Sequence, residues 1–98
     1  NLLGWRAAWM AASGTLPGVE GTMAKLFTTE HYQFAGNELV DALGSDGLRR
    51  HGDPTATAAD GWIEAIYRHC QVTTIYGGTS EVLRGIIAER GLQLPRNR

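Results

Sequence analysis

Two adjacent glycines stand directly before a predicted helix start that carries a hydroxyl and a carboxylate, and this combination could bind a ligand. The residues are Gly77, Gly78, Thr79, Ser80 and Glu81. Glycine permits positive φ and lets a ligand approach the backbone, while the free N–H groups of a first helical turn attract anions and polar edges. A plain turn between two helices also uses two glycines, so these residues alone leave both interpretations open.

The helix after these glycines is predicted from its ends and its apolar stripe. Thr79 is expected to be the N-cap, because its hydroxyl can accept a hydrogen bond from an N–H one turn further on. Glu81 then lies in the first turn, where the helix dipole favours a negative charge. Gly91 and Pro95 are expected to end the helix. The apolar side chains that share one face are Val82, Leu83, Ile86 and Ile87.

His69 and Cys70 are adjacent and invite comparison with a catalytic dyad. Neighbouring helical residues point about 100° apart, so these two side chains cannot share a proton in place. We therefore expect Cys70 in the core and His69 at the surface or between helices. Glu30 falls on the apolar side of its segment, where a buried carboxylate would need a partner, and a catalytic role for it is disfavoured.

Three further segments are predicted to be helical: residues 2–12, 19–43 and 60–73. Pro17 between glycines separates the first two, and Gly36 is expected to mark a close helix crossing. Asp60 is a candidate cap or first-turn acid of the third segment. Residues 44–57 are predicted to be a loop. Its basic residues could reach a phosphate, although a solvated loop is the favoured interpretation; they are Arg49, Arg50 and His51.

Composition points to one small helical domain. The 98 residues are 43% apolar but only 8% aromatic, which suits a helical bundle better than a β-sandwich. The net charge of −1 gives no indication of nucleic acid or of an acidic membrane as a partner. No metal-ligand spacing and no apolar run long enough for a membrane span occur. Cys70 is the only cysteine, which fits a reducing, cytoplasmic setting. We expect an all-α fold, an antiparallel up-down arrangement of helices.

The last third of the chain resembles the C-terminal signature of the acyl-CoA dehydrogenase family, flavoenzymes that oxidise acyl-CoA thioesters to 2-enoyl-CoA. The matching residues are Ile75 to Val82, Arg84, Ile86 to Arg90, and Leu94 to Arg96. The resemblance extends over residues 1–98 and implies the second half of the family's C-terminal helical domain, a partial four-helix bundle. It also implies that the chain is a fragment of a longer protein, and that the fragment alone is inactive and self-associates.

The resemblance implies two contact regions for FAD. Thr79, Ser80 and Glu81 are expected to line the cofactor site. The second region meets the adenosine half of FAD bound to a neighbouring subunit, and its matching positions are Asp41, Gly44, Ser45, Asp46 and Gly47. The first three of these are the expected contacts. This second pattern is degraded, because Asp41 replaces a glutamine and Ser45 replaces a glycine.

The resemblance also places Tyr76, Gly77 and Gly78 at the acyl-CoA substrate, and it exposes a missing base. Many members carry a glutamate directly after the signature tyrosine, and Gly77 at that position cannot take a proton. The favoured explanation is a glutamate on an earlier helix, before Asn1. A non-catalytic subunit of a heteromeric dehydrogenase, as in steroid side-chain degradation, is the alternative. A cofactor-free helical interaction module is a third possibility.

For the whole protein, the resemblance implies an oxidoreductase of fatty-acid β-oxidation and lipid metabolism. Its expected partners are an acyl-CoA substrate, an electron-transfer flavoprotein or similar acceptor, and further subunits in a homo- or hetero-oligomer. Neither nucleic acid nor a membrane is expected as a partner.

Overall fold

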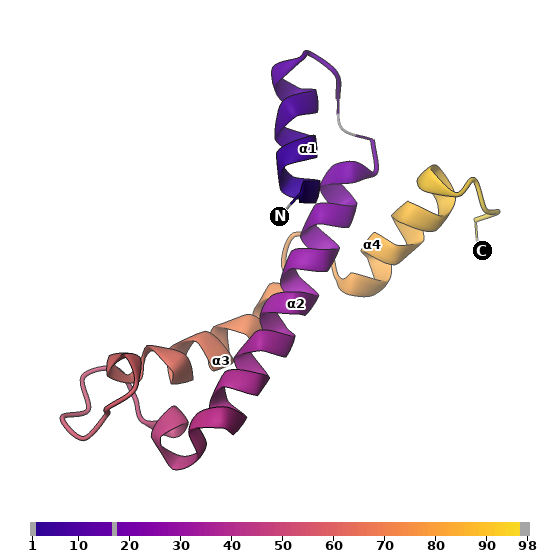
Figure 1. Ribbon diagram of the computed structural model, residues 1–98. Helices are drawn as coiled ribbons and strands as arrows, with labels where there is room; N and C mark the ends of the chain where they lie inside the picture. The colour runs from indigo at the N-terminus through magenta and orange to yellow at the C-terminus, as the bar shows by residue number, and fades with distance from the viewer. Residues whose placement is uncertain (1, 17, 97–98) are drawn as a thin grey trace. The chain divides into compact units, whose positions relative to one another are not determined.

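The computed structural model describes residues 2–16 and 18–96, and all regular structure within these residues is helical (Figure 1). The α-helices are α1 (Leu2–Ala12), α2 (Glu20–Leu43), α3 (Trp62–Thr73) and α4 (Ser80–Ile86). Two short 3₁₀ segments, η1 (Gly44–Leu48) and η2 (Ala59–Gly61), precede α3, and a π-helical turn, η3 (Ile87–Gly91), continues α4. The all-α prediction is therefore confirmed.

The helix ends agree with the sequence patterns within one or two residues, with two exceptions. Gly14 adopts a positive φ of 72° after α1, whereas Pro17 lies outside the described residues. The prediction of a plain loop over residues 44–57 is wrong for its first five residues, which form η1. The prediction that Asp60 caps α3 is also wrong. Asp60 has a left-handed φ of 50°, and Gly61 is the N-cap, without a capping side chain.

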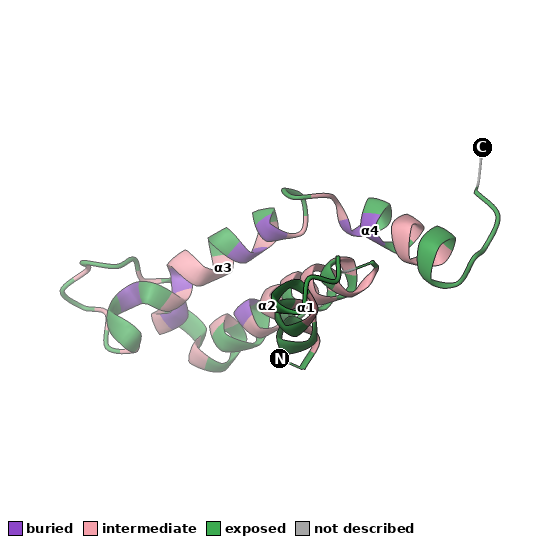
Figure 2. Cartoon of the chain, turned by 90° about the horizontal axis from the view of Figure 1, so that it is seen from above, coloured by how far each residue is buried: buried purple, intermediate pink, exposed green. Residues whose placement is uncertain are grey.

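The chain divides into two compact units, each described by itself, and the second is Thr29–Tyr76. Here the C-terminal half of α2 and α3 run side by side in opposite directions (Figures 1 and 2). They cross closely at Gly36, where an added Cβ would lie 2.8 Å from the Sγ atom of Cys70. Beside the crossing, Gln33 donates to Gln71 over 2.5 Å, and Gln71 donates to Asn37 over 3.4 Å. The expected close crossing at Gly36 is confirmed.

The first unit consists of Asn1–Thr28 and Gly77–Arg98. Arg6 of α1 forms a 3.3 Å ion pair with Glu20 at the start of α2. The methyl groups of Val19 lie 3.4 Å from the place where a Cβ of Gly91 would be. Leu83 of α4 is the buried apolar side chain among the described residues of this unit, with 6% of its surface exposed.

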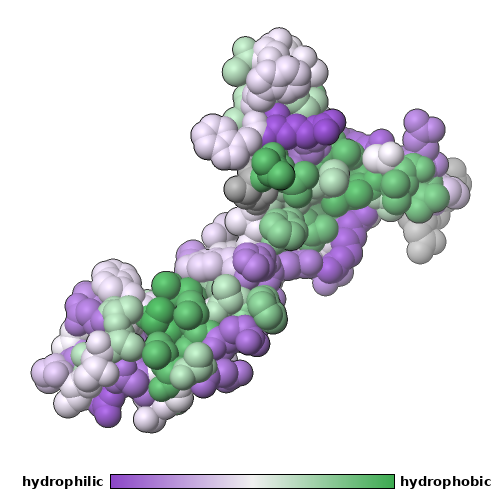
Figure 3. All heavy atoms as spheres, in the orientation of Figure 1, coloured by the Kyte–Doolittle hydropathy of each residue, from purple (hydrophilic) through white to green (hydrophobic). Residues whose placement is uncertain are grey.

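Little apolar surface is covered within either unit. Among the described residues, the buried hydrophobic side chains are Cys70 and Leu83. No described residue of α1 is buried, and its Trp5 is 75% exposed. Apolar side chains gather at the surface of each unit in the space-filling view (Figure 3). The apolar stripe expected on α4 is partly covered, since Leu83 is buried and Ile86 and Ile87 are half-buried, whereas Val82 is exposed.

Candidate functional site

The turn before α4 has a backbone that favours glycine at two consecutive positions. Gly77 has φ of 68° and Gly78 has φ of 98°, a region that other residues adopt only with strain. A Cβ at Gly78 would also lie 3.1 Å from Leu83, the buried side chain of this unit. Gly77 is exposed, so its backbone is open to an approaching group. Both glycines are thus explained by the path of the chain, whatever binds there.

The start of α4 is capped as the sequence predicts. The Thr79 side chain accepts a 3.3 Å hydrogen bond from the Val82 N–H, and its carbonyl accepts the first helical bond from Leu83. Ser80 is buried. The Glu81 carboxylate accepts hydrogen bonds from the Glu81 backbone N–H and from the Thr79 hydroxyl, and these bonds lower the pKa of this carboxyl below its ordinary value. In the described chain Thr79 and Glu81 therefore serve helix capping.

Lys25 of α2 reaches this same turn from 53 residues away in the sequence. Its ammonium donates a 2.7 Å hydrogen bond to the carbonyl oxygen of Gly78, and the bond is partly buried. Its Cε atom lies 3.9 Å from the place where a Cβ of Gly77 would be. Sequence reasoning missed Lys25. The only available signal is a lysine flanked by the apolar stripe residues Met23, Leu26 and Phe27.

Tyr76 precedes the turn and belongs to the second unit. Its side chain is 52% exposed, and its ring lies 6.3 Å from that of His69, centre to centre. His69 in turn makes an edge contact with Tyr32 of α2, also at 6.3 Å. His69 is exposed and lies between helices, as expected.

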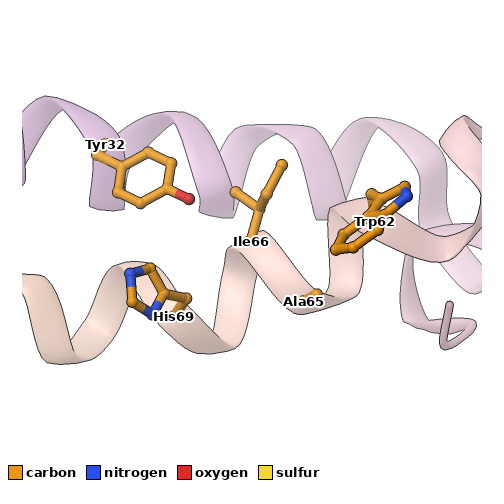
Figure 4. Close-up of a pocket in the computed structure, with 5 residues that line it drawn as sticks. All are labelled: Tyr32, Trp62, Ala65, Ile66 and His69. Atoms are coloured by element: carbon orange, nitrogen blue, oxygen red, sulfur yellow. The ribbon is translucent and has the colours of Figure 1, made fainter.

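A shallow depression of about 220 Å³ lies between α2 and α3 in the second unit. Its lining residues are Tyr32, Trp62, Ala65, Ile66 and His69. Figure 4 shows Ile66 pointing from α3 toward α2, with Tyr32 and His69 at one end and Trp62 at the other. Sequence analysis assigned none of these lining residues to a ligand, although His69 neighbours Tyr76.

The thiol of Cys70 is a packing group. Cys70 is fully buried, and its Sγ lies 3.0 Å from the carbonyl oxygen of Tyr67. Burial raises the pKa of this thiol, which disfavours the nucleophilic thiolate. The prediction that Cys70 is a core residue is confirmed.

The second predicted cofactor region lies at the end of α2. Asp41 and Ser45 are exposed, and Gly44 has a left-handed φ of 57° where η1 begins. Asp46, not Asp41, organises the segment that follows. Its carboxylate accepts hydrogen bonds from the Ala58 N–H at 2.7 Å, from the Thr57 hydroxyl at 2.9 Å and from the Thr57 N–H at 3.3 Å.

These hydrogen bonds, first that from Ala58, lower the pKa of the Asp46 carboxyl. Arg49 lies 3.3 Å from the Asp46 carboxylate and 3.8 Å from that of Asp53, and it also contacts the Thr55 hydroxyl. The Arg49 guanidinium therefore has its partners within the loop, which agrees with the favoured interpretation of this segment as a solvated loop.

The entry to α3 brings two backbone segments into close contact. His51 stacks on Trp62 with ring centres 4.2 Å apart, and its Nδ1 lies 2.9 Å from the carbonyl oxygen of Asp60. A Cβ at Gly61 would lie 2.3 Å from backbone atoms of Arg50. This close approach explains why position 61 is a glycine, and the left-handed φ of Asp60 accounts for its not capping the helix.

Among residues 2–16 and 18–96, no cluster of three or more potential metal ligands occurs, and no helix is long and apolar enough to cross a membrane. The cofactor candidates fall in different units, with Thr79, Ser80 and Glu81 in the first and Asp41, Gly44 and Ser45 in the second.

Comparison with known proteins gives a consistent result. Residues 1–92 match the family model described as acyl-CoA dehydrogenase, C-terminal domain. The acyl-CoA dehydrogenase FadE29 of Mycobacterium tuberculosis is 32% identical over 96 residues, which are 98% of this chain and 24% of the relative. The chain thus spans about a quarter of the length of such relatives.

Solved structures agree with the sequence matches. The ChsE4-ChsE5 complex from Mycobacterium tuberculosis contains a chain with 33% identity and a TM-score of 0.85, over 98% of this chain and 24% of that chain. The Tcur3481-Tcur3483 steroid ACAD gives 34% identity and a TM-score of 0.88, over 98% and 25%. The similarity therefore includes the helical fold as well as the sequence.

Proposed function

Because the chain belongs to the acyl-CoA dehydrogenase family as a C-terminal domain, we propose that the natural protein that contains it is an FAD-dependent acyl-CoA dehydrogenase. The reaction is the α,β-dehydrogenation of an acyl-CoA thioester to its 2-enoyl form. The observation that carries this proposal is the family match over residues 1–92, which includes the turn at Gly77 and Gly78. The covered quarter of the relatives' length supplies part of the site.

The residues at the turn fit a flavin in part. Gly77 and Gly78 carry no side chain, so the backbone next to them is accessible to a planar group. Thr79, Ser80 and Glu81 would hold FAD, with Thr79 offering its hydroxyl or N–H and Glu81 a backbone or side-chain hydrogen bond. Bound FAD would supply the oxidant that accepts a hydride from the substrate. Asp41, Gly44 and Ser45 would contact the adenosine half of FAD in a neighbouring subunit.

The substrate side of the site would be formed by Tyr76, Gly77 and Gly78. Gly77 has no proton acceptor, so the base that removes the α-proton would come from an earlier helix of the protein. The lack of a side chain at Gly77 would leave room for a branched or bulky acyl group. The steroid ACAD among the similar structures supports a steroid side chain as one such group.

A second candidate function is a non-catalytic subunit of a heteromeric dehydrogenase. One similar structure is a complex of two different chains, ChsE4 and ChsE5, which supports the heteromeric assembly that this candidate needs. As an active dehydrogenase, the protein would act in the cytoplasm and pass electrons to an electron-transfer flavoprotein or a similar acceptor. If the natural protein showed no flavin absorbance, it would instead be a cofactor-free interaction module.

Substitution of Thr79 tests the cofactor site. Loss of an N-cap hydroxyl costs about 1 kcal/mol of stability, so Thr79→Ala should lower the melting temperature and also the flavin content. Thr79→Ser keeps the hydroxyl and should retain both. Cys70→Ala serves as a control, because it destabilises the second unit without touching the turn. If Thr79→Ala keeps its flavin as well as Cys70→Ala does, the assignment of Thr79 to the cofactor site is wrong.

Substitution of Gly77 separates the active enzyme from the silent subunit. A side chain at this left-handed position costs about 1–2 kcal/mol, so Gly77→Ala is the control for Gly77→Glu. With an earlier base present, two acids would share the site, and Gly77→Glu should reduce turnover below Gly77→Ala. In a silent subunit, Gly77→Glu could create turnover instead. An active protein that is indifferent to both substitutions would place Gly77 away from the reacting atoms.

A further inference from the structure

The turn at Gly77 and Gly78 has few local constraints. Both glycines have positive φ, and glycine adopts positive and negative φ about equally readily, so φ is not fixed by the residue type. The last bond of the preceding helical segment runs from the Tyr76 N–H to Val72, and the first of the following helix runs from the Leu83 N–H to Thr79. The turn therefore depends on contacts with more distant residues for a fixed conformation.

Two such contacts hold the turn from different sides. Leu83 packs where a Cβ of Gly78 would be, at 3.1 Å, and limits movement toward the interior of the unit. Lys25 donates to the Gly78 carbonyl at 2.7 Å, and its Cε atom lies 3.9 Å from the place where a Cβ of Gly77 would be. A hydrogen bond from an ammonium is stronger and shorter than one between neutral groups, so the contact with Lys25 is the stronger directional constraint.

We propose that Lys25 is a positioning residue, which fixes the Gly77–Gly78 turn so that the two glycines and the start of α4 meet cofactor and substrate in one arrangement. The proposal rests on the proposed function. Since a misplacement of about 1 Å at a reacting centre can lower a rate by about two orders of magnitude, a clamp outside the reacting atoms can control turnover. Lys25 acts through the Gly78 carbonyl and needs no contact with the substrate.

Three substitutions test the proposal in the natural protein, with every segment that it carries. Lys25→Met keeps the apolar stem and removes the ammonium, whereas Lys25→Arg keeps the charge and the donors. Arg90→Met is the control, because it removes one exposed positive charge from η3, at the end of the α4–η3 stretch that lies away from the turn. If Lys25→Met is not recovered as folded protein, Lys25→Gln replaces it, since its shorter side chain also loses the ammonium.

The first readout is hydrogen exchange of the amides of residues 77–80, which does not depend on activity. Losing a hydrogen bond to a charged group should raise their exchange rates about tenfold or more in Lys25→Met. Lys25→Arg should restore most of the protection, and Arg90→Met should match wild type. Unchanged exchange in Lys25→Met would overturn the proposal, even if wild type proved to have no enzymatic activity.

The second readout is steady-state turnover of an acyl-CoA thioester, with flavin content and melting temperature measured alongside. Lys25→Met should lower kcat about tenfold or more at similar KM, with partial recovery in Lys25→Arg. An active wild type whose kcat survives Lys25→Met despite a loosened turn would overturn the positioning role. A wild type without flavin and turnover would refute the proposed function, while hydrogen exchange would still decide whether Lys25 clamps the turn.

Discussion

Replacing Gly36 with alanine should destabilise the crossing of α2 and α3, although alanine favours helices. The added methyl carbon would lie 2.8 Å from the Sγ of Cys70, closer than carbon and sulfur approach without a shift. It would lie 3.6 Å from both the Cβ of Cys70 and the Cα of Tyr67, which are ordinary contacts. The conflict is therefore with a single atom, and that atom is fully buried.

Two opposing terms set the size of the effect. Alanine gains about 1 kcal/mol over glycine in a helix interior. Crowding a packed contact costs about 1–3 kcal/mol. The sulfur cannot turn away freely, because Cys70 is fully buried and its Sγ already lies against the carbonyl oxygen of Tyr67. We expect a net loss of about 1 kcal/mol in Gly36→Ala.

The partner variant Cys70→Ala makes the reasoning testable, since it removes the conflicting atom. Alone it should cost about 1 kcal/mol through lost burial. In the double variant the new methyl group would occupy space that the sulfur leaves. The two losses should then fail to add, with a coupling energy of about 1–2 kcal/mol that favours the double variant.

Native-state hydrogen exchange of amides in α2 and α3 measures these differences locally, within the natural protein. Gln71→Ala provides a comparison at the same crossing, because it removes the amide contacts without adding volume. Gly36→Ala with slower exchange than wild type would refute the close crossing. Strict additivity of the two single substitutions would refute the contact with Cys70.

Three further results are expected. Acidification should loosen the segment at Thr57 and Ala58, because the folded state lowers the pKa of Asp46. The stability that this gives is complete above the ordinary pKa of 3.8 and is lost as pH falls through the lower native pKa. Hydrogen exchange of the Ala58 amide whose protection does not change with pH would contradict this. Asp46→Asn should loosen the same segment already at neutral pH, as seen by exchange of the Ala58 amide, and unaltered protection would count against it. Gly61→Ala should lower the free energy of unfolding by more than the cost of a left-handed alanine alone, about 1–2 kcal/mol, because its Cβ would lie 2.3 Å from backbone atoms of Arg50. A smaller loss in a thermal melt would mean that the segments at Arg50 and Gly61 are not in contact.

Local signals predicted the helices and their ends well. The cap at Thr79, the glycine stops and the helical spacing of apolar residues each act within one or two turns, so they can be read from the sequence. Gly36 was predicted to lie at a crossing because a glycine inside a helix costs stability unless something needs the space. Cys70 supplies that reason.

Contacts between distant residues were not predictable in the same way. Lys25 reaches Gly78 across 53 positions, and no periodicity encodes that pairing. Asp60 has the right residue type for a cap, but the contact between Gly61 and Arg50 places it in left-handed backbone. The spacing of apolar residues in α1 predicts a helix, yet it cannot tell which surface covers Trp5.

The candidate site could be recognised from sequence chiefly by its resemblance to a family. Gly77, Gly78 and Thr79 would also suit a plain interhelical turn, and their geometry is fully explained by the turn and the cap. The physical pattern locates where a ligand could approach, whereas the family match supplies the identity of the ligand.

Anaerobic mixing of the natural protein with acyl-CoA thioesters tests the central claim most directly. The protein should be purified together with any subunit that accompanies it, and the thioesters should include straight-chain, branched and steroid side-chain groups. We predict that bound FAD loses its visible absorbance with at least one thioester, and that the corresponding 2-enoyl-CoA forms in equal amount. Protein that binds no FAD, or whose FAD no thioester in the panel reduces, would contradict the assignment as an acyl-CoA dehydrogenase.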